Sequence, residues 1–227
     1  MSNGLKTLES MSQAQWYNKW TLNKFKKFLN GEILEVGCGI GNFTRTLTSF
    51  GQVWAIDINN EYIEKIGERV DRGTQVGFGN IEKGEYFFQT RKFDTIVCLN
   101  VLEHIKDDVA TVNNLHKLLK KNGKLILLVP AHRFLYGEID RSIGHFRRYD
   151  KIALTKKFEK LGFKVAFSRR INFLGALGWF IAGKILQKET VGEENIKIFN
   201  LIAPLVLPLE NLIEPPIGTS ILIDAKK

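Results

Sequence analysis

The sequence lacks the features that mark secreted and membrane-spanning proteins. Its two cysteines, Cys38 and Cys98, stand far apart, which excludes a disulfide framework and favours a reducing, cytoplasmic location. Residues 1–12 are polar and lack the apolar core of a signal peptide. The most apolar stretch, residues 171–186, is interrupted by Asn172, three glycines and Lys184, so it falls short of a bilayer-spanning helix. We therefore expect a protein that does not cross a membrane, with peripheral membrane contact left open.

The chain also lacks internal repeats and low-complexity linkers. Its 227 residues, 44% of them hydrophobic and 25% charged, predict a single globular domain over residues 1–227. The net charge of +9 attracts anions, so nucleic acid, anionic lipid and phosphorylated metabolites are all open as partners. A solvated basic surface without a dedicated partner is the alternative.

Hydrophobic periodicity along the chain alternates between helical and strand patterns. An amphipathic helix is expected at residues 16–29, within an N-terminal helical segment of residues 1–30 that Asn30-Gly31 ends. The expected strands are residues 33–36, 53–56, 74–78, 93–99, 125–129, 163–167 and 219–223, and the expected intervening helices are residues 42–50, 61–70, 109–120 and 152–161. This alternation predicts a parallel sheet whose ligand lies at the carboxyl ends of the strands.

A glycine turn follows the first strand and carries Gly37, Gly39 and Gly41. Glycines allow a tight turn and close approach to a ligand at a helix amino terminus. In the dinucleotide fingerprint the third glycine comes one residue later, where this chain has Asn42, so a nicotinamide dehydrogenase is disfavoured. The second strand ends at Asp57, a carboxylate placed to accept hydrogen bonds from ribose hydroxyls. A tight turn with a helix-capping Asp57 is the structural alternative.

This series of strand, glycine loop, helix and strand-terminal Asp57 resembles class I methyltransferases that use S-adenosylmethionine (SAM). The resemblance implies an α/β, Rossmann-like three-layer sandwich with a mostly parallel seven-stranded sheet and an antiparallel last strand. It also implies that SAM is the cofactor. Asn80, or alternatively Glu82, would accept a hydrogen bond from the adenine amino group. The full implied cofactor set is Glu35, Gly37, Gly39, Gly41, Asp57, Ile58, Asn80, Ile81, Asn100 and Val101.

The turn Leu102-Glu103-His104 after the fourth strand is similar to that of quinone-biosynthesis O-methyltransferases. Some of those bind a divalent cation through a Glu, a second Glu three residues on and the adjacent His. Here Asn100 stands at the first of these positions, so we expect no metal and a turn-orienting role for Glu103 and His104. The segment also lacks the Pro-Pro-aromatic and Pro-Cys motifs of enzymes that methylate nucleic-acid bases, which disfavours a nucleic-acid acceptor.

The loop after the fifth strand, residues 130–149, is dense in polar side chains and resembles that of a subgroup of prokaryotic methyltransferases. Arg147 and Arg148 are candidates for holding a phosphate or carboxylate of the acceptor, with Tyr136 and Tyr149 beside them. His132 and His145 are candidates for the general base, since imidazole titrates near neutrality. The alternative is that the arginines pair with surface carboxylates and the histidines are structural.

A helical insertion, residues 171–215, separates the last two expected strands. Its glycines predict broken helices, and its apolar residues require something to cover them. A cap over the acceptor site, a homodimer face and a membrane-interfacial surface all fit. The lysines at 184, 188 and 197 allow the last of these.

Together these patterns predict a SAM-dependent methyltransferase. The expected reaction is methyl transfer to an oxygen, in preference to nitrogen or carbon, of a small-molecule, lipid-linked or glycan-linked acceptor, with an anionic acceptor left open. The alternatives are an RNA methyltransferase, motivated by the net charge of +9, and a non-catalytic SAM-fold binding protein.

Overall fold

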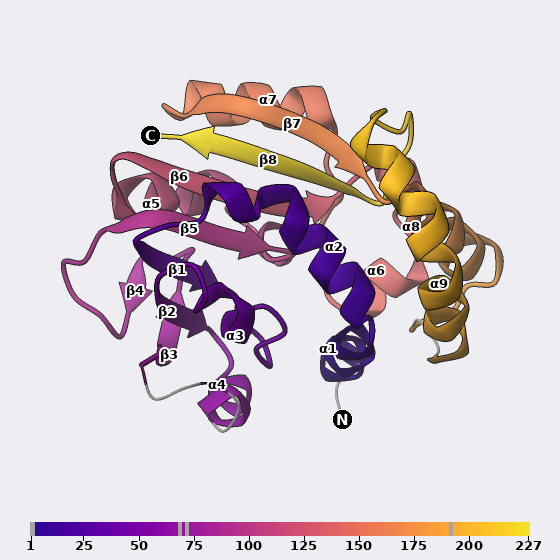
Figure 1. Cartoon of the computed structure of the whole chain (residues 1–227), viewed down its shortest axis with the longest axis horizontal. Coiled ribbons are helices and arrows are strands. Elements are labelled where there is room, and N and C mark those ends of the chain that lie inside the picture. The colour runs from indigo at the N-terminus through magenta and orange to yellow at the C-terminus, as the bar shows by residue number, and fades with distance from the viewer. Residues whose placement is uncertain (1–2, 68–69, 71–72, 191–192) are drawn as a thin grey trace.

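The computed structural model describes residues 3–67, 70, 73–190 and 193–227. Within these residues, eight strands form one sheet in the order β4-β3-β2-β1-β5-β6-β8-β7 (Figure 1). The strands are β1 (Glu32–Val36), β2 (Gln52–Asp57), β3 (Gln75–Asn80), β4 (Glu85–Tyr86), β5 (Phe93–Leu99), β6 (Leu119–Pro130), β7 (Lys164–Ile171) and β8 (Ser220–Lys226). The seven expected strands are present, and the two-residue β4 adds an antiparallel edge to β3.

The pairing directions confirm the expected Rossmann-like sheet. β1 is parallel to β2 and β5, β3 is parallel to β2, and β6 is parallel to β5. Strand β8 runs antiparallel to both β6 and β7. The carboxyl ends of β1, β2, β3, β5 and β6 therefore meet at one edge of the sheet, which is where an α/β fold binds its ligand.

Helices cover both faces of this sheet, so the central strands are buried on both sides. In β1 alternate residues enter different cores: Leu34 belongs to one hydrophobic cluster and Ile33 to the other. The first core is closed by α5 (Asp108–Leu118) and α7 (Lys151–Lys160), and the second by α2 (Gln15–Phe25) and α9 (Glu193–Val206). Figure 1 shows α2 in front of the strands and α5 and α7 behind them.

Three expected helices differ from the structure in length. The helix predicted at residues 42–50 is only one turn, α3 (Thr44–Leu47), because three of its residues are threonines, which favour helices weakly. The helix predicted at 61–70 is α4 (Asn60–Gly67), and positions 68–69 lie outside the described residues. The helix predicted at 109–120 ends at Leu118, since Leu119 pairs with β5 as the first residue of β6.

The N-terminal segment forms two helices, α1 (Asn3–Gln13) and α2, separated at Ala14. The insertion is broken, as its glycines predict: α8 (Phe173–Trp179) continues into a π-helical turn, Phe180–Ile185, and α9 continues into a 3-10 turn, Leu207–Asn211. Along α9, Ile196 and Ala203 enter the core, whereas Leu201 and Leu205 are 76% and 78% exposed. Within the described ranges, none of the helices combines the length and the apolar character needed to cross a bilayer.

Candidate active site

The glycine loop after β1 adopts a backbone that only glycine accommodates easily. Gly37, Gly39 and Gly41 have φ angles of +71°, +53° and +86°. A Cβ atom on Gly37 would lie 2.3 Å from Cγ2 of Val101, and one on Gly41 would lie 2.8 Å from Cγ1 of Ile66. The Gly37 N–H donates to the carbonyl of Ile56 in β2 at 2.8 Å, which fixes the loop against the neighbouring strand. Conformation and space therefore both require glycine here.

Asp57, at the carboxyl end of β2, ties the glycine loop to the second strand. Its Oδ2 accepts the Gly39 N–H at 2.8 Å, and its Oδ1 accepts the Asn59 N–H at 2.9 Å. Burial raises the pKa of Asp57, although these backbone hydrogen bonds oppose the rise. A carboxylate has about four lone-pair positions, so two hydrogen bonds leave acceptor capacity for a ligand. Contact of the loop and of this carboxylate with SAM stays a prediction.

Glu35 lies beneath the loop and is almost completely buried. It accepts a hydrogen bond from the Thr44 hydroxyl at the start of α3. Burial raises the pKa of Glu35 to about 8, the Thr44 hydrogen bond opposes the rise and the nearby Asp57 adds to it. The structure thus gives Glu35 a role in holding the loop to α3, and its contact with the cofactor stays a prediction.

The other predicted cofactor residues line the same edge of the sheet. Ile58 is 63% exposed directly after Asp57, as a side chain that packs on a ligand face must be. Asn80 ends β3, where its Oδ1 accepts the Lys83 N–H at 3.1 Å, and the adjacent Ile81 is buried. Glu82, the alternative to Asn80, instead accepts the backbone N–H of Asp107 at 2.9 Å.

Asn100 and Val101 follow β5 at the centre of this edge. Asn100 is exposed and has a φ of +55°, a conformation that is uncommon outside glycine and that concentrates at functional sites. Its backbone N–H donates to the carbonyl of Leu128 in β6 at 2.8 Å, which anchors the strained residue between two strands. Cofactor contact by both residues stays a prediction, but the structure places them beside the glycine loop.

Helix α1 approaches the glycine loop from outside the sheet, a contact that the sequence did not reveal. A Cβ atom on Gly39 would lie 3.3 Å from Cδ1 of Leu8, and Asn42 donates to the Leu8 carbonyl at 3.2 Å. Residues so distant in the chain meet only through packing, and a polar N-terminal segment carries no signal for such a contact. The N-terminal helix therefore forms one wall of the candidate cofactor site.

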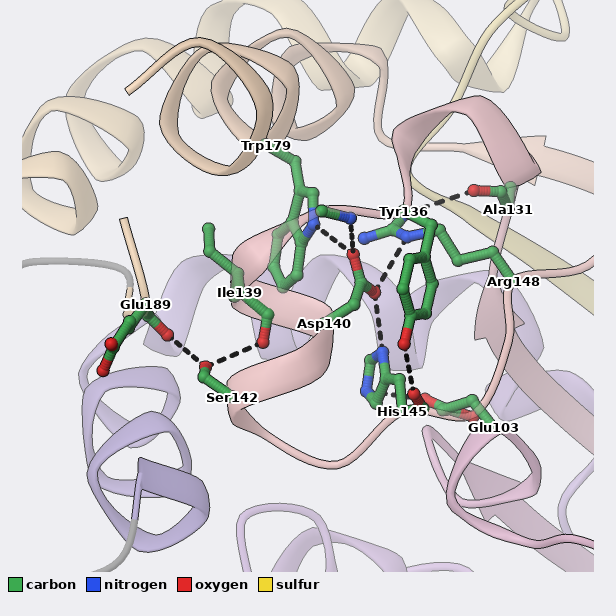
Figure 2. A network of polar contacts seen from close by, with 11 residues as sticks. Glu103, Ala131, Tyr136, Ile139, Asp140, Ser142, His145, Arg148, Trp179 and Glu189 are labelled. Carbon is green, nitrogen blue, oxygen red and sulfur yellow. Dashed lines mark hydrogen bonds and ion pairs between the residues drawn. The ribbon is translucent and has the colours of Figure 1, made fainter. Parts of the chain in front are cut away.

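The loop after β6 is organised around one buried carboxylate, Asp140, in α6 (Glu138–Ser142). It accepts hydrogen bonds from His145 Nδ1 at 2.7 Å, Arg148 Nε at 2.9 Å, the Gly137 N–H at 3.0 Å and Trp179 Nε1 at 3.1 Å. Figure 2 shows Asp140 between Trp179 of the insertion and His145 of the loop. Burial raises the pKa of Asp140, but the hydrogen bond from His145 and the Arg148 guanidinium bring it below its usual value.

Asp140 and Trp179 were not among the predicted site residues. The spacing of Gly137 and Asp140 is that of a helix cap with an acidic residue at its third position, and this signal could have identified Asp140. No local pattern points to Trp179, because its partner lies on a different element 39 residues away. Asp140 therefore joins the insertion to the loop in a way that only the tertiary structure shows.

The predicted acceptor residues all have partners within the protein. Arg148 is fully buried and also donates to the Ala131 carbonyl at 3.1 Å. Arg147, whose side chain is 35% exposed, donates to the Lys106 carbonyl at 2.8 Å and lies 3.4 Å from an Asp108 carboxylate oxygen. Arg147 thus has a carboxylate partner, although Asp108 is buried and not on the surface, whereas Arg148 belongs to the buried network. Acceptor binding by either arginine stays a prediction.

The two predicted tyrosines close turns of the backbone. The Tyr136 hydroxyl donates to the His145 carbonyl at 2.8 Å. The buried Tyr149 hydroxyl donates to the Leu102 carbonyl at 3.1 Å and lies 3.4 Å from Asp108. These contacts connect the loop to the turn after β5, and a contact between either tyrosine and the acceptor stays a prediction.

Of the two candidate bases, His145 lies in the same cluster as Glu103 and His104. His145 Nε2 is 3.7 Å from Glu103 Oε1, and its ring centre is 4.6 Å from that of His104. Desolvation, followed by the proximity of His145, lowers the pKa of His104 to about 4, against a hydrogen bond to the Gly144 backbone. Burial raises the pKa of Glu103 to about 8, opposed by a backbone hydrogen bond and by Arg148.

His132 lies apart from this cluster, on a separate cavity of about 90 Å³ that Tyr149 and Arg170 also line. It has a φ of +61°, and its buried Nε2 has no hydrogen-bond partner among the described residues. Burial, and then the charge of Arg170, lowers the pKa of His132. The ring is therefore neutral near pH 7 and able to accept a proton.

Comparison with known proteins identifies a shared domain. Residues 13–166 match the model of a family described as a methyltransferase domain. An uncharacterised protein of Methanocaldococcus jannaschii is 28% identical over 69% of this chain and 65% of its own length. A ubiquinone biosynthesis O-methyltransferase of Xanthomonas euvesicatoria pv. vesicatoria is 34% identical over 42% of this chain and 41% of its own. The chain thus covers less than two thirds of these curated relatives.

Solved structures share the fold over nearly the whole chain. A SAM-dependent methyltransferase of Mesorhizobium loti superposes with a TM-score of 0.65 at 12% identity, covering 94% of this chain and 98% of the other. A phosphoethanolamine N-methyltransferase of Haemonchus contortus, solved with SAM, gives a TM-score of 0.63 at 18% identity, covering 92% of this chain and 52% of the other. At such identities the likeness concerns the fold alone.

Proposed function

Because the chain belongs to the methyltransferase domain family and uses S-adenosyl-L-methionine, we propose that it methylates a hydroxyl oxygen of a lipid-linked acceptor. One observation carries the choice of acceptor. The insertion presents an apolar outer face, including Leu201 and Leu205, and it is joined to the polar loop after β6 through Trp179 and Asp140. An acceptor with an apolar tail and a polar head matches this arrangement of surfaces.

The cofactor would lie across the carboxyl edge of the sheet. The free acceptor capacity of Asp57 would receive the ribose hydroxyls, and Ile58 would pack on the adenine. The glycine loop would hold the amino-acid end, with the exposed Asn100 beside the methionine chain. SAM supplies an electrophilic methyl group on sulfur, so the protein's main task is to align the acceptor for in-line attack.

Oxygen is the proposed methylated atom because side chains that can take up a proton lie close to this edge. A hydroxyl must lose its proton as it attacks, and His132 and His145 are the candidate bases. The Xanthomonas relative, a ubiquinone biosynthesis O-methyltransferase, agrees with this choice. The same proposal includes binding of an anionic headgroup by Arg147, because its side chain remains partly exposed.

The insertion would bring the protein to the membrane surface that holds such an acceptor. Exposed lysines at 184, 188 and 197 lie among the exposed apolar residues of the insertion. Lysines beside an apolar face suit a helix that lies in the headgroup region. A homodimer face would use the same apolar residues, and flotation with anionic liposomes beside analytical ultracentrifugation distinguishes the two.

The test supplies SAM with a tritiated methyl group to the lipid and aqueous extracts of the source cells. We expect label in the organic phase, resistant to ribonuclease, and a mass increase of one methyl group on a hydroxyl of the product. The double variant Leu201→Ser/Leu205→Ser should lose this transfer and keep SAM affinity, whereas Lys117→Ser, an exposed change on α5, should alter neither. Label that ribonuclease removes would instead establish the RNA methyltransferase, and label confined to small aqueous products would refute the lipid acceptor.

A further inference from the structure

We propose that a row of three lysines on the α2 side of the sheet, Lys124, Lys164 and Lys226, binds a membrane surface that contains anionic lipid. The row lies toward the amino ends of the parallel strands, whereas the candidate cofactor site lies at their carboxyl ends. In Figure 1 this is the end of β8 marked C, away from α8 and α9. The choice of a lipid as partner rests on the proposed lipid-linked acceptor, but the row itself does not.

Strand pairing places the three lysines side by side. Lys226 of β8 pairs with Lys124 of β6 on one side and with Lys164 of β7 on the other. Directly opposite residues project from the same face, and neighbouring strands are about 5 Å apart, so the three Cα atoms span about 10 Å. This face is the α2 side, because Leu222, four residues before Lys226 on β8, enters the core that α2 closes.

A fourth lysine and two aromatic rings extend the row. The ammonium groups of Lys27 and Lys124 each lie 4.9 Å from the ring centre of Phe28. Phe28 in turn packs on Phe167 of β7, with 5.7 Å between the ring centres. Burial raises the pKa of the neighbouring Asp224, and the charges of Lys124 and Lys27 oppose that rise. The rings support the lysine stems while the ammonium groups stay at the surface.

The positive charge of the row has little compensation within the protein. Among the described residues, none of these four lysines forms an ion pair. Like charges directly opposite each other destabilise a sheet. Lysine on an edge strand prevents unwanted strand pairing, which explains Lys164 on β7, but Lys124 and Lys226 are on the interior strands β6 and β8. A negatively charged partner would remove this repulsion.

The surroundings of the row favour a lipid surface over single-stranded RNA. Proteins that bind single strands stack bases on open aromatic rings beside their basic side chains. Here Phe28 is partly buried, and the ammonium groups of Lys27 and Lys124 lie over its ring. An anionic leaflet needs no such platform, because its surface potential attracts any local cluster of lysines.

The insertion provides the apolar contact that complements the basic row. Ile196 and Ala203 of α9 enter the same core as Leu222, so α9 belongs to the same side of the sheet as the row. Strand β8 has seven residues, Ser220–Lys226, so the row stands about 20 Å from the point where the insertion rejoins the sheet. Stable membrane attachment generally combines an apolar element with a second signal such as a basic patch. The row would supply the electrostatic part of this attachment.

Flotation of the full chain with vesicles tests the row, using phosphatidylcholine alone and phosphatidylcholine mixed with phosphatidylglycerol. The triple variant Lys124→Gln/Lys164→Gln/Lys226→Gln should bind the mixed vesicles about a hundredfold more weakly than the wild type, since each lysine near an anionic surface contributes about fivefold. Binding of the wild type to the mixed vesicles should also weaken with added salt. Leu201→Ser/Leu205→Ser should instead weaken binding to both kinds of vesicle, because it removes apolar contact.

The matched control removes three charges from the other side of the sheet. Lys117→Gln/Lys156→Gln/Lys160→Gln changes exposed positions on α5 and α7. It should alter binding to the mixed vesicles by less than about threefold, because charges farther than a Debye length from the membrane are screened. Circular dichroism and unchanged SAM affinity show that each variant is folded.

Equal flotation of the two triple variants would overturn the row as a docking surface, even if lipid methylation is observed. Binding of a labelled single-stranded RNA that only the row variant loses, with unchanged vesicle binding, would overturn the lipid partner. Flotation that depends on the row, without methylation of any lipid extract, would support the docking surface and refute only the proposed acceptor.

Discussion

Replacing Asp57 by Ala tests the candidate cofactor site most directly. In the structure, this carboxylate accepts N–H groups of Gly39 and Asn59 at 2.8 and 2.9 Å, and its remaining lone pairs are those proposed for the ribose. The substitution removes the ribose partner and releases the glycine loop. A hydrogen bond to a charged group contributes about 1.5–3 kcal/mol, so SAM affinity should fall about 10–150-fold.

Calorimetric titration of SAM into the folded variant measures this loss, with NADH as the specificity control. Asp94→Ala is the matched variant, because Asp94 also accepts a backbone N–H, from Glu32 at 2.8 Å, and lies at the opposite end of β5 from Asn100. Its SAM affinity should stay within about twofold of the wild type. If folded Asp57→Ala binds SAM within about threefold of the wild type, the carboxylate does not hold the cofactor and the proposed site is wrong.

Three further predictions concern stability, each measured by urea denaturation. Gly41→Ala should cost about 1–3 kcal/mol, because its φ is +86° and the added Cβ would lie 2.8 Å from Ile66; an unchanged midpoint would mean that the loop relaxes freely. Asp140→Asn should cost about 3–5 kcal/mol by leaving the buried Arg148 uncompensated, and a loss below about 1 kcal/mol would contradict that pairing. The pKa of Glu103 rises from 4.5 to about 8, so the native state binds more protons than the unfolded chain between these values, and its stability should fall as pH rises through that window. Glu103→Gln should flatten this decline, and an identical pH profile would refute the assignment.

Much of the cofactor site was predictable from the sequence because it depends on local backbone chemistry. The positive φ angles of Gly37, Gly39 and Gly41 explain why only glycine suits these positions, and the pattern of apolar residues predicts the strands beside them. The candidate role of Asp57 was predictable because this residue ends the second apolar strand, β2. Helix ends were less predictable from the sequence. Leu119 fits the helical pattern of the preceding residues, but in the structure it pairs with β5 as the first residue of β6, and helical periodicity alone does not predict such strand pairing.

The acceptor side was decided by the tertiary structure. The sequence identified the polar character of residues 130–149, but only the tertiary structure shows that Arg148 is buried as a partner of Asp140. The contacts of Trp179 with Asp140 and of Leu8 with the glycine loop join elements that are distant in the chain. Such contacts depend on how α1 and the insertion pack on the sheet. A local pattern fixes which face of an element is apolar, but not which polar groups meet when the faces are buried.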